Sequence, residues 1–180
     1  MNIKDNLLHM KDITELMLDL AYSAVFLKDK AIAEKVKEMH KEVAMLEDST
    51  LKMLFKVREP EEDRMFIVDL TDSMKDIANA ALHIAELSDV KGKPSIVKDM
   101  LREGTERVIS VEISSKSEYA NKTISESQIR TNTRCNIIGI KRKGEWIFSI
   151  DKETKLLPKD EVIAVGTHNA DRNFKKKSSG

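Results

Sequence analysis

The sequence predicts an α+β protein, in which an N-terminal antiparallel bundle of three long helices precedes a small four-stranded α+β module. Two patterns predict this fold. In the first half, apolar residues recur at alternating spacings of three and four, as in amphipathic helices. Across residues 107–166, short segments alternate apolar and polar residues, as in strands. We expect a helical domain over 1–90, a linking helix over 91–104, the module over 105–168 and a C-terminal tail over 169–180.

The first predicted helix starts near Met10, ends at residues 28–30 and carries two apolar stripes. The seam comprises Ile13, Met17, Leu20, Ala24 and Leu27. The second stripe, roughly opposite, comprises Leu18, Tyr22, Val25 and Phe26. Packing of this helix on both sides within one chain would explain the second stripe, but we favour a contact in a homodimer. Burying four such side chains contributes roughly 6 to 12 kcal/mol, similar to the cost of association at about 4 to 15 kcal/mol. This stripe alone predicts a weak dimer.

Two further amphipathic helices complete the predicted bundle. The second runs over about residues 31–57, with a seam of Ile32, Val36, Met39, Val43, Leu46, Met53 and Val57. Pro60 opens the third, because proline suits the first helical turn. The seam of the third helix comprises Ile67, Leu70, Met74, Ile77, Ala81 and Ile84.

Four strands are expected in the module, over residues 108–113, 135–141, 145–149 and 161–165. The second is apolar on both faces, which favours a central position in the sheet. Lys143 and Gly144 predict a hairpin turn between the second and third strands. Thr123 and Glu126 form a capping-box pattern that predicts one short helical turn. Within the tail, residues 175–180 begin with three consecutive lysines and are expected to be a short, disordered basic segment.

Composition and motifs exclude several classes of function. The net charge is zero, so nothing favours a nucleic-acid partner. The lone Cys135 fits a reducing cytoplasm, and we expect no membrane span and no signal peptide. The four histidines are scattered, and there is no phosphate-binding loop, nucleophile elbow or dinucleotide fingerprint. We therefore expect a cytoplasmic protein that is not an enzyme and has no cofactor.

Three segments of the module resemble the TrkA-C domain, the regulatory RCK-C module of proteins that gate potassium channels and transporters. They are residues 117–124 (SEYANKTI), 137–144 (IIGIKRKG) and 156–166, with LLPKD followed by VIAVG. The usual glycines of that family fall here at Asn121, Arg134 and Lys159, and a usual proline falls near Ile150. Asparagine tolerates positive φ, whereas arginine and lysine would be strained there.

The helical half is similar to a PhoU domain over residues 10–24, 33–36, 76–81 and 84–86. The whole chain resembles archaeal proteins that join one PhoU-type bundle to one TrkA-C module. Pro94 and Gly104 fit the first turn and the C-terminal cap of a helix that joins the two parts.

The TrkA-C resemblance implies a ligand site. Modules of this family that sense cyclic di-adenosine monophosphate (cyclic di-AMP) bind it between two copies, and the matching positions here are Ile129, Arg130, Asn136 and Ile137. Arginine offers a planar fork for phosphate, and asparagine can both donate to and accept from a base edge. The alternative is that both isoleucines are core residues and Arg130 is a surface charge.

The PhoU resemblance implies a metal motif that this sequence lacks. In an ungapped match, its two carboxylates fall on Lys75 and Asn79. Asp72, Asp76 and His83 share a polar stripe and are weak alternative ligands, although such a stripe is usually a solvated face. We expect no metal. The resemblances together predict a cytoplasmic, homodimeric regulatory subunit that partners a membrane channel or transporter for potassium or other cations. The alternative is a PhoU-like metal-binding scaffold in phosphate-transport signalling.

Overall fold

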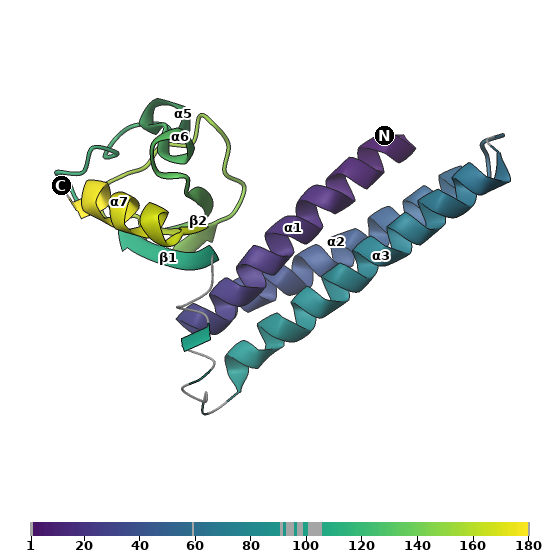
Figure 1. Ribbon diagram of the computed structural model, residues 1–180, viewed down its shortest axis with the longest axis horizontal. Coiled ribbons are helices and arrows are strands. Elements are labelled where there is room, and N and C mark those ends of the chain that lie inside the picture. The colour runs from purple at the N-terminus through teal and green to yellow at the C-terminus, as the bar shows by residue number, and fades with distance from the viewer. Residues whose placement is uncertain are drawn as a thin grey trace. The chain divides into compact units, whose positions relative to one another are not determined.

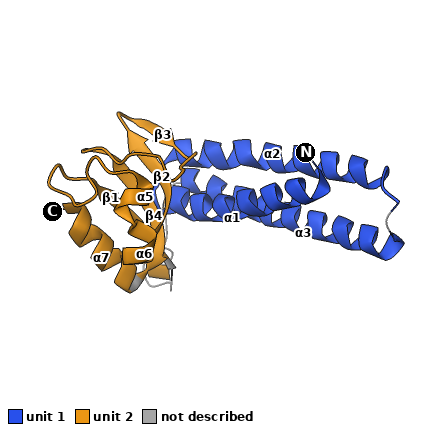
Figure 2. Cartoon of the chain, turned by 90° about the horizontal axis from the view of Figure 1, so that it is seen from above, with its two compact units in different colours: residues 1–91 blue, residues 92–180 orange. Residues whose placement is uncertain are grey.

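The computed structural model describes residues 2–58, 60–90, 92, 96, 99–100 and 106–179. The chain divides into two compact units, residues 1–91 and residues 92–180 (Figure 2). Pro94 and Gly104, on which the predicted linking helix depends, lie outside the described residues. Over the described ranges, no helix has the length and apolarity needed to span a bilayer.

The first unit is a bundle of three long helices, which lie side by side (Figure 1). They are α1 (Ile3–Leu27), α2 (Lys30–Leu54) and α3 (Glu61–Glu86), followed by the 3₁₀ turn η1 (Leu87–Asp89). The predicted bundle is confirmed. Helix α1 begins seven residues before the predicted Met10, because Asn2 and Asp5 form a capping box. The Asn2 side chain accepts a hydrogen bond from the backbone N–H of Asp5, and the Asp5 carboxylate accepts one from the backbone N–H of Asn2. Pro60 precedes the first residue of α3, as its fixed φ favours.

The seams of α1 and α2 are buried much as the periodicity predicts. The seam of α3 differs. The buried residues of α3 are Thr71, Met74, Ala78, Ala81 and Ala85. Two residues of the predicted seam, Leu70 and Ile77, keep 38% and 41% of their surface exposed. Small side chains inside allow α3 to approach its neighbours closely, and they leave the larger apolar side chains of α3 outside the core.

The second apolar stripe of α1 is only partly accessible. Val25 is buried, Leu18 and Phe26 are half-buried, and Tyr22 is 41% exposed. A homodimer contact through this stripe stays a prediction. Tyr22 is better placed than Val25 to make such a contact.

The second unit is built on a four-stranded antiparallel sheet, which confirms the predicted α+β module. The strands are β1 (Glu106–Glu112), β2 (Asn136–Arg142), β3 (Glu145–Ile147) and β4 (Glu161–Thr167), in the spatial order β1-β4-β2-β3. Strand β2 is internal, as its two apolar faces predict. Lys143 and Gly144 have φ values of 52° and 91° and close the β2–β3 hairpin. Two positive φ angles in a two-residue loop fit the right-handed twist of the strands.

The sheet is accompanied by the helices α5 (Ile124–Ser127), α6 (Ile129–Thr133) and α7 (His168–Ser179). The capping box of Thr123 and Glu126 is present at the start of α5. Helix α7 lies along β1 (Figure 1) and also packs on β4 and α6. The expectation that residues 175–180 are disordered is therefore wrong for residues 175–179, which belong to this helix.

Helix α7 is ordered because it buries one narrow stripe. Ala170 and Phe174 are almost completely buried in the core of the sheet unit, and the Phe174 ring lies 5.9 Å from that of Tyr119. The carbonyl oxygen of Lys177 accepts a hydrogen bond of 2.8 Å from the Ser117 hydroxyl. That of Ser178 accepts one of 3.0 Å from the backbone N–H of Ser114. These contacts join α7 to the segment after β1.

The three positions where the TrkA-C pattern has glycine all keep a positive φ. Asn121, Arg134 and Lys159 have φ values of 64°, 61° and 71°. The chain retains these turns without glycine and bears the steric cost of a side chain in the left-handed region.

Candidate functional site

A pocket of about 230 Å³ in the sheet unit contains all four predicted ligand-binding positions. Its lining comprises Ile124, Ile129, Arg130, Cys135, Asn136, Ile137, Ile150, Asp151 and Lys152. These residues come from α5, α6, the start of β2 and the loop after β3. The sequence prediction therefore named side chains that do lie together.

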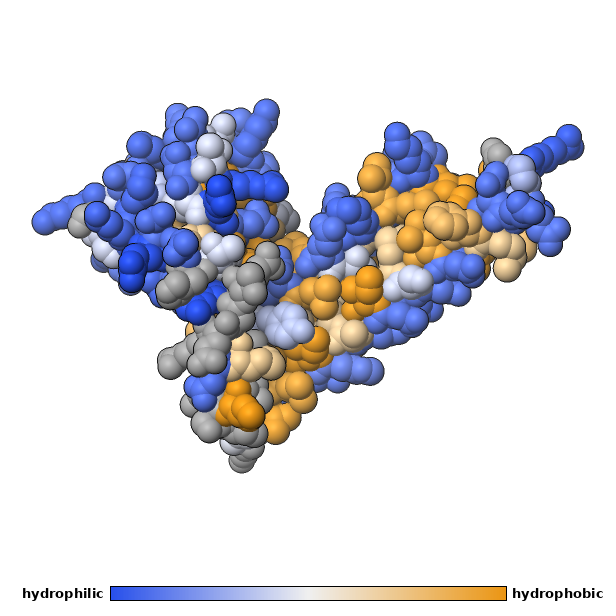
Figure 3. Space-filling model, viewed as in Figure 1, coloured by the Kyte–Doolittle hydropathy of each residue, from blue (hydrophilic) through white to orange (hydrophobic). Residues whose placement is uncertain are grey.

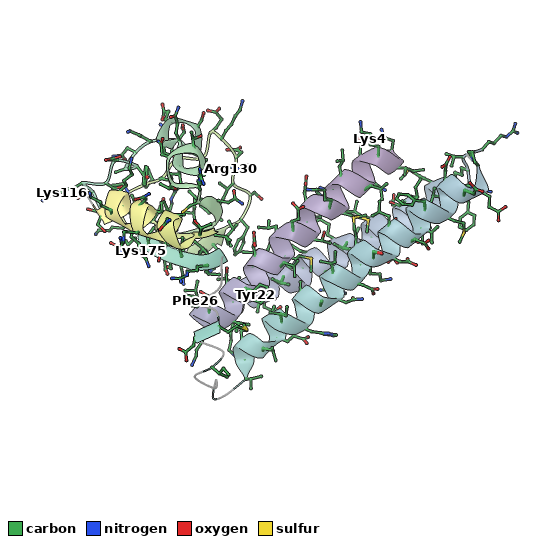
Figure 4. The ribbon with its side chains drawn as sticks, in the orientation of Figure 1. Lys4, Tyr22, Phe26, Lys116, Arg130 and Lys175 are labelled. Atoms are coloured by element: carbon green, nitrogen blue, oxygen red, sulfur yellow. The ribbon has the colours of Figure 1, made fainter. Side chains whose placement is uncertain are left out.

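Helix α6 and the turn after it bring Arg130 close to the start of β2. The helix begins after Gln128, whose φ is 47°, and ends at Arg134, whose backbone N–H donates to the carbonyl of Arg130. Strand β2 starts two residues later at Asn136. Within α6, Ile129 is 2% exposed and belongs to the core, whereas Arg130 is exposed on the surface (Figure 4).

The far wall of the pocket is a loop that backbone hydrogen bonds hold against residues 121–125. The N–H groups of Asn121, Ile124 and Ser125 donate to the carbonyls of Leu156, Thr154 and Lys152 at 2.7 to 2.9 Å. This pairing fixes the loop of residues 150–156 beside α5. Asp151 and Lys152 consequently face the same pocket as Arg130.

The pocket combines positive charge with apolar surface. Arg130 and Lys152 are exposed cations, and Ile137 and Ile150 are half-buried. Asp151 is the one carboxylate in the lining, and it is already engaged. It accepts hydrogen bonds of 2.8 Å from the Thr154 hydroxyl and 3.0 Å from the backbone N–H of Glu153. The bond from Thr154 is the main reason that the pKa of Asp151 is lowered. This arrangement suits a small anion that also carries an apolar group.

Sequence reasoning missed the contribution of the 150–156 loop. Its link to α5 is made through backbone groups, which any sequence supplies. The only local signal is Ile150, an apolar residue at the start of a polar stretch. The alternative interpretation of Ile129 as a core residue is correct, because this residue belongs both to the core and to the pocket wall.

The weak metal candidates are exposed on α3. Asp72, Asp76 and His83 are all accessible, and the described part of the chain contains no group of three or more potential ligands. At the positions of the family motif, Lys75 pairs with Glu47 of α2 at 2.6 Å. Asn79 shares a hydrogen bond of 2.7 Å with His40 of α2. Both side chains therefore serve packing between α2 and α3, and the absence of a metal stays a prediction.

Comparison with family models identifies both parts of the chain. Residues 7–89 match the model of the PhoU domain, and residues 108–177 match that of the TrkA-C domain. The chain contains a PhoU domain followed by a TrkA-C domain. Both predicted resemblances are confirmed. The TrkA-C match extends through most of α7, so this helix is part of the TrkA-C domain.

Solved structures similar to the chain include RCK-C domains. One is the RCK_C domain dimer of S. agalactiae BusR in complex with c-di-AMP, with 23% identity, a TM-score of 0.38 and coverage of 41% of this chain and 91% of that chain. Another is the RCK C domain of the potassium transport protein KtrA in complex with c-di-AMP. It has 27% identity, a TM-score of 0.37 and coverage of 46% of this chain and 94% of that chain.

A third similar structure is S. agalactiae BusR in complex with its busAB-promotor DNA. It has 18% identity, a TM-score of 0.38 and coverage of 64% of this chain and 52% of that chain. The expectation that this chain has no nucleic-acid partner stays a prediction. A search of curated protein sequences gives no match.

Proposed function

We propose that this protein is a non-enzymatic regulatory subunit for the transport of potassium or other cations, and that its TrkA-C domain senses a small anionic ligand. The observation that carries the proposal is the pocket that unites Ile129, Arg130, Asn136 and Ile137. The TrkA-C domain supports the regulatory class, because the family that it resembles gates potassium channels and transporters. We expect the protein to act as a homodimer in the cytoplasm, beside the membrane channel or transporter that it controls.

The size of the pocket favours a ligand shared by two copies of the chain. One pocket holds about 230 Å³, whereas small-molecule sites usually occupy about 300 to 1,000 Å³. Two such pockets that face each other across a twofold axis would enclose about twice the volume. A twofold ligand with two phosphates would then meet one Arg130 on each side. Cyclic di-AMP has this symmetry and charge, and it is the first candidate.

Arg130 is the proposed anchor for phosphate. Its guanidinium carries a permanent charge in a planar fork that matches two phosphate oxygens. Each charge-assisted pair of one arginine with one phosphate contributes roughly 1.5 to 3 kcal/mol. Two copies of Arg130 would therefore contribute about 3 to 6 kcal/mol, which corresponds to roughly two to four powers of ten in affinity.

Calorimetric titration of the full chain with cyclic di-AMP tests this proposal. We expect Arg130→Ala to weaken binding by about 100- to 10,000-fold. The affinity of Arg130→Lys should lie between those of Arg130→Ala and the wild type, because lysine keeps the charge without the fork. The matched control is Arg172→Ala, which removes an exposed arginine from α7, outside the pocket. An unchanged affinity in Arg130→Ala would refute the anchor, and no binding by the wild type would remove this ligand.

A further inference from the structure

The PhoU domain has an open apolar groove that the proposed ligand site does not use. It lies between α1 and α3, near the end of α2, and has a volume of about 770 Å³. The large apolar residues that line it include Leu8, Leu54, Ile67, Leu70, Met74 and Ile77. It extends along residues 3–15 of α1 and 63–77 of α3. At 1.5 Å per residue, this is a length of roughly 20 Å, or about four helical turns.

The residue choice on α3 indicates that this groove becomes covered. The inward positions Thr71, Ala78 and Ala81 hold small side chains and are completely buried. The larger Leu70 and Ile77 line the groove instead, and remain about two-fifths exposed. An isolated bundle would gain more by burying the large residues and exposing the small ones. The face of α1 and α3 is therefore suited to an apolar partner.

The same face carries two exposed apolar side chains, Leu8 and Tyr22, that can fill such a groove. On α1, Lys4, Leu8, Lys11, Glu15 and Tyr22 follow one another at helical spacings of three, four and seven, which places them on one stripe. Leu8 is 50% exposed and Tyr22 is 41% exposed. Figure 4 shows Lys4 and Tyr22 toward opposite ends of α1. Figure 3 shows apolar residues gathered on the helical unit where α1 and α3 lie side by side.

A twofold dimer requires a surface that is complementary to itself, and this face has the necessary features. It presents a hollow together with protruding apolar side chains. Its rim carries two cations, Lys4 and Lys11, and two anions, Glu15 and Asp63. Lys11 pairs with Glu15 at 2.8 Å. Lys4 and Asp63 have no ion pair among the described residues, which leaves one charge of each sign for a second copy.

The face is large enough for a stable dimer contact. Helices α1 and α3 contain 25 and 26 residues, so each is about 38 Å long, and two helices side by side are roughly 20 Å wide. The face thus covers about 760 Å² per copy, close to the roughly 800 Å² per partner in specific protein interfaces. A short partner helix would fill only the groove. A second copy would cover the whole face, including Tyr22.

We propose that a second copy of this chain docks on the α1–α3 face, with the apolar side chains of each copy entering the groove of the other. This interface lies in the PhoU domain and does not depend on a ligand in the TrkA-C pocket. The Arg130 variants leave it untouched, so the two proposals fail separately.

Cysteine cross-linking in the full chain tests the interface directly. The native Cys135 is 1% exposed and reacts little. Single variants Leu8→Cys, Leu70→Cys and Ile77→Cys place a thiol on the face, and Met45→Cys places one on α2, where the native residue is 72% exposed. With a short bismaleimide, we expect a covalent dimer from at least one of the three face variants and none from Met45→Cys. Equal yields from the face variants and Met45→Cys would overturn the proposal and leave another molecule as the occupant.

A charge-insertion variant separates this face from any dimer contact in the TrkA-C domain. Adding Leu70→Glu and Ile77→Glu to the Leu8→Cys chain should reduce cross-linking at least tenfold, since four carboxylates would enter the apolar contact. Adding Met45→Glu should leave the yield unchanged. Helical circular dichroism checks that each variant is folded. A cross-link that persists with both glutamates present would contradict the proposed interface, whatever the mass of the particle in solution.

Discussion

At the residue scale, Tyr119 shows how burial controls ionisation in the TrkA-C domain. Its ring packs on Phe174 and is 2% exposed. Its hydroxyl has no hydrogen-bond partner among the described residues. Burial is the main cause that raises the pKa of Tyr119 to about 12, and the charge of Glu118 adds to it. The neutral phenol is thus strongly preferred in the folded state.

This preference predicts a loss of stability in alkaline solution. The pKa of an unfolded tyrosine is about 10, so the unfolded chain releases the proton first as pH rises. The stabilisation is complete below pH 10 and is lost between about pH 10 and 12. From about pH 9 to 11.5, the wild type should lose roughly 2 kcal/mol more of its free energy of unfolding than Tyr119→Phe, which has no phenol to ionise. Urea unfolding at both pH values checks this, and equal losses in the two proteins would contradict it.

The buried carboxylate of Asp160 anchors the turn that leads into β4. It is 1% exposed and accepts hydrogen bonds from Arg142 at 2.7 and 2.9 Å and from the backbone N–H of Leu157 at 2.7 Å. Hydrogen bonding to Asp160 is also the main cause that raises the pKa of Arg142. The guanidinium of Arg142 donates in addition to the carbonyl of Lys155 at 2.7 Å. This pair therefore joins β2 to the loop that forms the far side of the pocket.

Removing this carboxylate should destabilise the domain strongly. We expect Asp160→Ala to lower the free energy of unfolding by about 3 kcal/mol, because it leaves a partly buried arginine without its anion. The control is Glu145→Ala, which removes an exposed carboxylate from β3 and should change stability by less than about 0.5 kcal/mol. Chemical denaturation measures both. Equally small losses of stability in the two variants would contradict this expectation, because they would show that water fully replaces Asp160 as the partner of Arg142.

At the element scale, the turns after α6 and before β4 carry residues that their backbone geometry disfavours. Arg134 and Lys159 have φ values of 61° and 71°, where a side chain meets its own backbone. Glycine has no such conflict. Arg134→Gly and Lys159→Gly should each stabilise the domain by about 1 kcal/mol. Asn121→Gly should gain less, since asparagine tolerates this region. Thermal unfolding tests the order, and a destabilised Arg134→Gly or Lys159→Gly would show that side-chain contacts outweigh the strain.

Sequence periodicity predicted the helices and strands well, but it did not predict which face of α3 points into the core. In α3, two overlapping stripes satisfy the same spacing, and one contains Leu70 and Ile77 whereas the other contains Thr71 and Ala78. Reasoning from hydrophobicity selects the stripe with larger residues. The structure buries the smaller ones, because close helix packing decides the inward face.

The same limit explains the error at the C-terminus. Helix α7 is polar on average, and the buried ones among its described side chains are Ala170, Phe174 and Ser178, spaced four residues apart. The ligand pocket was predictable where the TrkA-C pattern names positions, as for Arg130 and Asn136. It was not predictable at Lys152, whose place depends on backbone pairing between distant segments.

At the scale of the whole molecule, each domain has one proposed role. The TrkA-C domain would bind a twofold anionic ligand between two copies, and the PhoU domain would contribute a second contact between copies through the α1–α3 face. Each role depends on different residues. Variants of Arg130 address the ligand, and variants of Leu70 and Ile77 address the helical contact.

The stoichiometry of ligand binding tests the central claim most directly. Titration of the full chain with cyclic di-AMP in a calorimeter, with light scattering on the same samples, gives both the ratio and the particle mass. We expect one ligand per two chains and a particle of at least twice the mass of one chain, which is 20.5 kDa. One ligand per chain on a monomer, or no heat of binding at all, would contradict it.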